Sequence, residues 1–167
     1  MEKVRYPKII YLTILLLSVL WCGGVILAPV LAGGHYNYIS DFLYSFYEKS
    51  CHQLEDRSLT IGGYALGVCS RCTAIYFGFM IGVVIYPFFK PLRNTELPSL
   101  WIIITAAGLV FLDVITDVTG IHKNTFVTRE ITGAVLGLVL PFYIIPGTVL
   151  VFHEYFNLPD KSASRGV

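Results

Sequence analysis

Four long apolar stretches, separated by shorter polar segments, dominate the pattern of the chain. A helix rises about 1.5 Å per residue, so about 20 apolar residues cross the hydrocarbon core of a bilayer. The stretches of suitable length cover residues 9–31, 73–89, 99–118 and 131–152. Three of them carry no charge, and the third carries only Asp113 and Asp117 near its end. The pattern predicts a bundle of four transmembrane helices, the fourth bent at Pro141 and Pro146.

Composition supports lipid as the surroundings of this bundle. Hydrophobic residues make up 55% of the chain and charged residues 14%, against about a quarter charged in an average soluble domain. A chain of 167 residues is too small to bury so much apolar surface away from water. The net charge of +1 excludes a nucleic-acid binder with a strongly basic face. We therefore expect one all-α integral membrane domain over residues 1–167, spanning the cell membrane several times.

The distribution of basic residues predicts the orientation of the helices. Seven lie before the first stretch, between the second and third, or after the fourth: Lys3, Arg5, Lys8, Lys90, Arg93, Lys161 and Arg165. Five lie on the other side: Lys49, Arg57, Arg71, Lys123 and Arg129. Because cytoplasmic loops are enriched in basic residues, we expect both termini in the cytoplasm. The long loop 32–72 would then be extracytoplasmic.

The long loop has its own apolar pattern. Between residues 36 and 50, apolar side chains recur at helical spacing, which predicts an interfacial helix whose start Ser40 and Asp41 could cap. Residues 59–68 are too few to span a bilayer, and their three glycines predict a re-entrant or packed segment. Glycines four residues apart, at 78 and 82 and again at 133 and 137, predict close contacts between transmembrane helices.

Three of the four cysteines gather around this loop and carry the candidate chemistry. Cys51 is followed directly by His52, and Cys69 and Cys72 form a CxxC pair at the start of the second stretch. A CxxC turn brings two thiolates to one ion, and a third cysteine with an imidazole can complete a tetrahedral Zn²⁺ shell. Adjacent side chains tend to diverge, so His52 could instead orient the site, with Asp113 as the fourth ligand.

Ionisable groups within or beside the apolar stretches extend this candidate site. A carboxylate inside a span needs a partner, and for Asp113 the candidates are Arg57, Arg71 and Arg129. A purely structural pair between Asp113 and Arg129, joining the third stretch to the fourth, is an equally good interpretation. Asp117 lies near the end of its stretch, where a solvated or capping carboxylate is the simpler expectation. His122 follows in the next loop and is a further candidate ligand.

Two other functions remain open at this point. Arg71 lies between Cys69 and Cys72 and could lower a thiol pKa, which would suit a membrane thiol oxidoreductase that passes electrons to a quinone, with Cys51 as resolving thiol. Alternatively, the chain is a non-catalytic subunit or scaffold that forms a homo-oligomer or joins a larger membrane complex. The sequence leaves open whether the protein is an enzyme.

The motifs also resemble those of a known family. CHQ at 51–53, Arg57-Ser58, CxRC at 69–72, and a later Asp113 followed by RxxTG at 129–133 are similar to a family of small prokaryotic membrane proteins of unknown function. The resemblance covers about residues 51–137 and implies a shared site built from these motifs. Two features depart from that family: Asp117 replaces a glutamine, and HKNTF at 122–126 replaces a loop rich in arginine, serine and asparagine. The resemblance implies no activity.

Overall fold

A computed structural model describes residues 6–121 and 123–157. The chain forms six α-helices and a short 3₁₀ helix in this part: α1 (Tyr6–Gly33), α2 (Asn37–Glu48), η1 (Glu55–Arg57), α3 (Ser70–Phe89), α4 (Leu100–Val118), α5 (Phe126–Val139) and α6 (Pro141–Asn157). Four helical segments are long and apolar enough to cross a membrane, namely α1, α3, α4 and the α5–α6 pair. The predicted all-α bundle with four membrane-spanning segments is confirmed.

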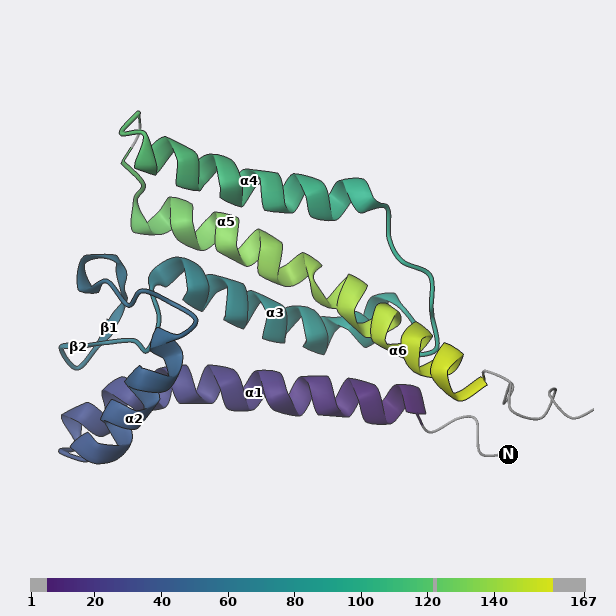
Figure 1. The fold of residues 1–167 in the computed structure, drawn as a ribbon, viewed down its shortest axis with the longest axis horizontal. Helices are drawn as coiled ribbons and strands as arrows, with labels where there is room; N and C mark the ends of the chain where they lie inside the picture. The colour runs from purple at the N-terminus through teal and green to yellow at the C-terminus, as the bar shows by residue number, and fades with distance from the viewer. Residues whose placement is uncertain (1–5, 122, 158–167) are drawn as a thin grey trace, which may run out of the picture.

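The long helices run side by side, in the order α1, α3, α5 and α4 across Figure 1. α3 contacts both α1 and α5, whereas α4 contacts mainly α5. α1 begins and α6 ends at one end of the bundle, and α2 and the rest of the long loop cover the other. We call this second end the loop end. There α1 and α4 finish and α3 and α5 begin, so the candidate site residues converge on it.

The fourth spanning segment is broken, as the sequence predicts. α5 ends at Val139 and α6 begins at Pro141, because proline lacks the N–H that would continue the ladder of hydrogen bonds. Pro146 lies inside α6 without interrupting it.

Closely approaching glycines join α3 to α5, which confirms the predicted role of the spaced glycines. A Cβ added to Gly137 would lie 2.3 Å from the carbonyl oxygen of Ile75, and one added to Gly78 would lie 2.9 Å from that of Ala134. No side chain fits at these distances. The backbones of the two helices are therefore in direct contact, and they hold Arg71 and Arg129 on adjacent helices at the loop end.

The long loop follows its predictions in part. Residues 59–68 pack against α1, where Leu66 and Val68 are buried beside Val25, as the predicted packed segment requires. α2 is present, but it begins at Asn37, before Ser40 and Asp41, so the predicted capping role of these residues is wrong. The Ser40 hydroxyl instead donates a hydrogen bond to the carbonyl of Ala28 (2.9 Å) and ties α2 to α1. Residues 59–68 form a two-stranded hairpin, β1 (Thr60–Ile61) and β2 (Tyr64–Ala65). Its turn is Gly62-Gly63, both with positive φ, a turn that glycine favours.

Candidate functional site

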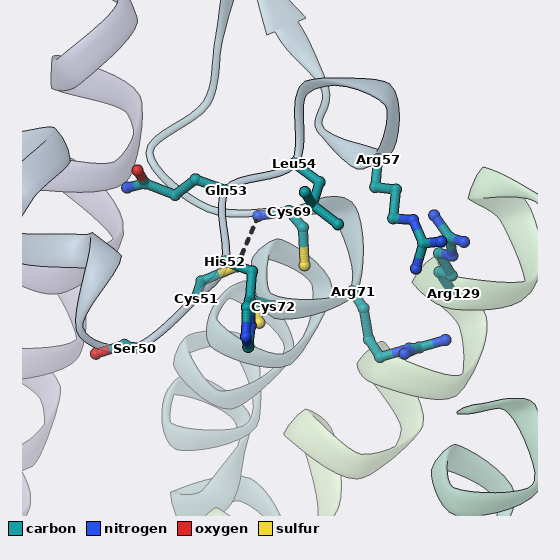
Figure 2. A pocket seen from close by; sticks show the side chains of 10 residues that line it. All are labelled: Ser50, Cys51, His52, Gln53, Leu54, Arg57, Cys69, Arg71, Cys72 and Arg129. Atoms are coloured by element: carbon teal, nitrogen blue, oxygen red, sulfur yellow. Dashed lines mark hydrogen bonds between the residues drawn. The ribbon is translucent and has the colours of Figure 1, made fainter. Parts of the chain in front are cut away.

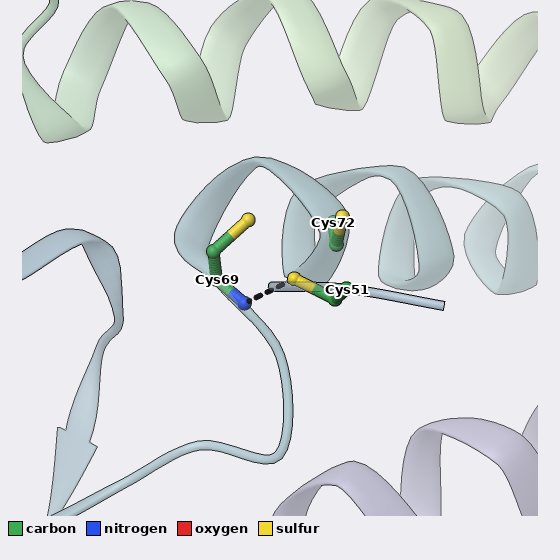
Figure 3. A group of neighbouring side chains, drawn as sticks. All are labelled: Cys51, Cys69 and Cys72. Atoms are coloured by element: carbon green, nitrogen blue, oxygen red, sulfur yellow. Dashed lines mark hydrogen bonds between the residues drawn. The ribbon is translucent and has the colours of Figure 1, made fainter. Parts of the chain in front are cut away.

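The three loop cysteines meet at the start of α3. Cys51 follows α2, Cys69 is the N-cap of α3, and Cys72 lies in the first turn of that helix. Their sulfur atoms all lie within 4.8 Å of one another, as Figure 3 shows. The backbone N–H of Cys69 donates a hydrogen bond to Cys51 Sγ (3.2 Å). Two segments separated in sequence thus bring three sulfur atoms close together, and we call this group the cysteine cluster.

The environment of Cys51 favours the thiolate form of this residue. Hydrogen bonds from the Cys69 and Cys72 side chains hold the pKa of Cys51 well below its usual value, although burial acts in the opposite direction. The cluster also lies at the N-terminus of α3, where the helix dipole stabilises negative charge. Cys51 is only 7% exposed. A buried thiol with a lowered pKa, beside two further thiols, has the chemistry of a metal ligand.

Gln53 holds together the two segments that carry the cluster. Its backbone adopts a positive φ of 48°, which is uncommon for a residue with a Cβ. Its side-chain amide donates to the carbonyl oxygens of Tyr44 (2.8 Å) and Gly67 (2.7 Å). The turn after Cys51 is thereby fixed to α2 and to the segment that follows β2 and leads into Cys69. Gln53 belongs to the CHQ motif, but no periodicity or charge in the sequence indicates this role.

Aromatic rings close the side of the cluster that faces the bundle. Trp21 makes edge contacts with Tyr47 and Tyr76, with ring centroids 5.3 Å and 5.6 Å apart. The Tyr47 hydroxyl donates to the carbonyl of Trp21 (2.8 Å). The cysteines pack against the same buried group as these rings. This layer of aromatic and apolar side chains separates the cysteine cluster from the middle of the membrane-spanning segments.

A cavity of about 370 Å³ opens beside the cluster. It is lined by Ser50, Cys51, His52, Gln53, Leu54, Arg57, Cys69, Arg71, Cys72 and Arg129. Figure 2 shows the cysteines on one side of this cavity and the three arginines on the other. His52 is exposed and belongs to the lining. Within residues 6–121 and 123–157, the three cysteines lie close enough together to bind one metal ion. The side chains of His52 and Asp113 are not part of this close group. His122 lies outside the described residues.

Two aspartates of α4 hold the three arginines of the cavity. Asp113 forms an ion pair with Arg71. Asp117 Oδ2 accepts from Arg57 Nη1 (3.3 Å) and Arg129 Nη2 (3.2 Å). We call these five residues the arginine–aspartate wall.

This pairing corrects two expectations from the sequence. Of the three candidate partners of Asp113, Arg71 forms the ion pair. The alternative of a structural pair between Asp113 and Arg129 is wrong, because Arg129 pairs with Asp117, one turn later in α4. Asp117 is not a solvated carboxylate either: its side chain is 13% exposed and accepts hydrogen bonds from both arginines.

Asn124 links the wall to the loop between α4 and α5. Its backbone N–H donates to Asp117 Oδ1 (3.1 Å), and its side-chain Nδ2 donates to the carbonyl of Asp113 (2.6 Å). The loop therefore fixes both aspartates from beyond the end of their helix. Sequence reasoning missed Asn124, since a single asparagine in a polar loop carries no distinctive signal.

Comparisons with known proteins agree with a membrane assignment. Residues 51–143 match the family described as "Predicted membrane protein (DUF2085)". An uncharacterized protein of Methanocaldococcus jannaschii is 35% identical over 141 residues, which cover 81% of this chain and 90% of that protein. An uncharacterized protein of Methanothermobacter thermautotrophicus is 31% identical over 90 residues, 54% of this chain and 79% of that protein. No solved structure matches the chain. The family match includes the cysteine cluster and the arginine–aspartate wall, and the chain belongs to the DUF2085 family of membrane proteins.

Proposed function

We propose that the cysteine cluster binds one Zn²⁺ ion, which fastens the long loop to the start of α3. The observation that carries this proposal is the approach of three sulfur atoms to within 4.8 Å. Zn–S bonds of about 2.3 Å place tetrahedral thiolates about 3.8 Å apart. Small side-chain rotations of the cysteines would bring their sulfur atoms to that spacing.

His52 is the residue best placed to supply a fourth ligand. Its side chain lines the cavity beside the cluster, whereas the Asp113 carboxylate is already paired with Arg71. Three cysteines and one histidine would make a closed shell of the type found at structural zinc sites. If water took the fourth position instead, the site would be open on its cavity side and suited to sensing or transport.

A structural role follows from which segments the ion would join. Cys51 comes from the turn after α2, and the other two ligands come from the first turn of α3. Between them lie η1 and a two-stranded hairpin, elements too small to be stable alone. Metal binding energy becomes folding energy when the unfolded chain has no preformed site. The ion would thus stabilise the loop end of the bundle.

The test is elemental analysis of protein purified anaerobically in detergent, with free thiols counted on the same sample. We expect about one zinc per chain, lost in Cys69→Ser and retained in Cys22→Ser. Cys22 is the matched control because it is a buried thiol of α1 outside the cluster. Absence of metal from the wild-type protein would contradict the proposal.

Thiol redox exchange is the second candidate, and the lowered pKa of Cys51 beside two thiols favours it. In this case Cys69 and Cys72 would form a disulfide and pass two electrons and two protons to a membrane quinone, giving the quinol. The same sample distinguishes the two functions. Metal-free protein that lacks two thiols until reductant is added would support redox exchange. Metal-free protein with every thiol reduced and intact folding would point to the scaffold role.

We also propose that both termini are cytoplasmic and that the loop end faces outward. Seven of the twelve basic residues lie on the side of the two termini and five lie on the side of the loop end. Cytoplasmic segments carry the excess of lysine and arginine, which supports this orientation. In intact cells, a membrane-impermeant thiol reagent should label Lys123→Cys and spare Asn94→Cys. The reverse labelling would overturn this orientation.

A further inference from the structure

Three arginines line the cavity beside the cysteine cluster, namely Arg57, Arg71 and Arg129. Arg71 pairs with Asp113, Arg129 pairs with Asp117, and Arg57 pairs with both Asp117 and Asp56, whose carboxylate lies 3.7 Å from Arg57 Nε. The three guanidinium charges are thus matched by three carboxylates, so the cavity would attract an anion through its hydrogen-bond donors.

Two buried arginine atoms also lack acceptors. The Arg129 side chain is only 9% exposed, and its Nε–H has no hydrogen-bond partner in the described part of the chain. The same holds for Nε of Arg71. An unsatisfied buried donor costs more than a typical hydrogen bond contributes. Both residues line the same cavity, so a group with acceptor oxygens bound there can satisfy both donors.

The surrounding backbone adds a positive field. α3 begins at Ser70 and α5 begins at Phe126, and both starts lie at the loop end (Figure 1). Helix N-termini favour anions. The carboxylates of the wall already accept from arginine side chains and from Asn124, so they do not satisfy the two Nε–H donors.

We propose that this cavity binds a phosphate-type oxyanion between Arg71 and Arg129, with Arg57 at the more exposed edge. Arginine donors from separate helices match an ion with several oxygens in different directions better than a carboxylate with two. The loop end is also where spanning helices end, at the level of lipid phosphates. The oxyanion is therefore either free phosphate or the headgroup of a phospholipid. This site does not depend on metal in the cysteine cluster.

Binding of inorganic phosphate to delipidated protein in a non-ionic detergent tests the proposal by calorimetry. Arg129→Lys keeps the charge but loses the Nε–H donor, so we expect affinity to fall roughly tenfold or more. Asp117→Asn removes a competing carboxylate and should strengthen binding. Acetate should bind more weakly than phosphate. Equal affinity in wild type and both variants, or equal binding of acetate, would overturn the proposal.

Phospholipid retained through purification separates the two sources of the oxyanion. If wild type retains about one phospholipid per chain and Arg129→Lys loses it, the ligand is a headgroup. If no lipid is retained but inorganic phosphate binds, the ligand is free phosphate. Failure of both arms refutes the site. Zinc content is measured in parallel: Cys69→Ser should leave phosphate binding intact, and Arg129→Lys should leave zinc intact, so the two proposals fail independently.

Discussion

The guanidinium group of Arg71 forms an ion pair with the carboxylate of Asp113, joining the first turn of α3 to the last turns of α4. Arg71 lies between Cys69 and Cys72 in the sequence. The first turn of α3 thus carries two of the three cysteines and also the arginine that contacts α4. Because α4 otherwise contacts mainly α5, this pair is a direct link between the cluster and the outermost helix.

Removing the carboxylate of this pair should destabilise the protein. In Asp113→Asn, the Arg71 guanidinium, only 19% exposed, loses its counter-charge, and we expect the free energy of unfolding to fall by about 3 kcal/mol. Thermal unfolding in detergent measures this. The double variant Arg71→Met, Asp113→Leu should lose less stability than the two single substitutions lose together. In the double variant neither charge of the pair is left buried without its partner. Glu96→Gln, in an exposed loop, is the control; strict additivity would contradict a coupled pair.

Gln53 should control metal affinity without touching the metal. Gln53→Ala removes both hydrogen bonds that join Tyr44 and Gly67 to the turn after Cys51. We expect zinc affinity to fall by about tenfold or more, with the same stoichiometry at saturating zinc. Competition with a chromogenic chelator measures the affinity. Asn94→Ala, at the opposite end of the bundle, should leave it unchanged. An unaffected Gln53→Ala protein would mean that the cysteines hold their positions without this turn.

The membrane-spanning helices could be predicted closely because each is a local pattern. The third stretch was expected over residues 99–118 and forms Leu100–Val118. The break at Pro141 follows from the chemistry of that residue alone. Leu140 is the single residue between α5 and α6. In each case the signal lies within the segment and needs no knowledge of its neighbours.

Features that depend on how helices pack together were not predictable in the same way. Which arginine pairs with Asp113 depends on the rotation and offset of α3, α4 and α5, and a single sequence does not encode that geometry locally. The hairpin is a different case. Gly62-Gly63 between Thr60-Ile61 and Tyr64-Ala65 is a recognised turn signal, but strands of two residues leave too little alternation to identify.

The cysteine cluster should show an unusual response to pH in the metal-free protein. The hydrogen bonds from Cys69 and Cys72 lower the pKa of Cys51, so the folded state releases this proton more readily than the unfolded state. Their stabilising effect is therefore complete above the ordinary thiol pKa and is lost as the pH falls through the lowered pKa. Unfolding of metal-free protein at several pH values should show that stability increases with pH between the lowered pKa of Cys51 and the ordinary thiol pKa.

Thiolate absorbance in the ultraviolet isolates the contribution of Cys51. At neutral pH we expect a thiolate signal in the metal-free wild type that disappears in Cys51→Ser. In Cys72→Ala the signal should require a higher pH, because one of the two side-chain donors to Cys51 is missing. Cys22→Ser should match the wild type. A wild-type titration at the ordinary thiol pKa would contradict the lowered value.

The contact between α3 and α5 should tolerate no added atom at Gly137. A Cβ there would lie 2.3 Å from the Ile75 carbonyl oxygen and 2.9 Å from the backbone nitrogen of Phe79. The obstacle is backbone, which cannot rotate away, so Gly137→Ala must push the helices apart. We expect a loss of about 1–3 kcal/mol or more. Gly108→Ala is the matched control, since α4 leaves that position with nothing within 4 Å.

The two alanine variants should therefore change the stability of the protein in opposite directions. Alanine favours a helix over glycine by up to about 1 kcal/mol, so Gly108→Ala should be neutral or stabilising, whereas Gly137→Ala should unfold at a lower temperature. Zinc content gives a second readout: parting α3 from α5 displaces Arg71 relative to Arg129 but leaves Cys69 and Cys72 on the same helical turn. We expect Gly137→Ala to retain its metal while losing stability. Equal thermal stability of the two variants would mean that the helices are not in backbone contact at Gly137.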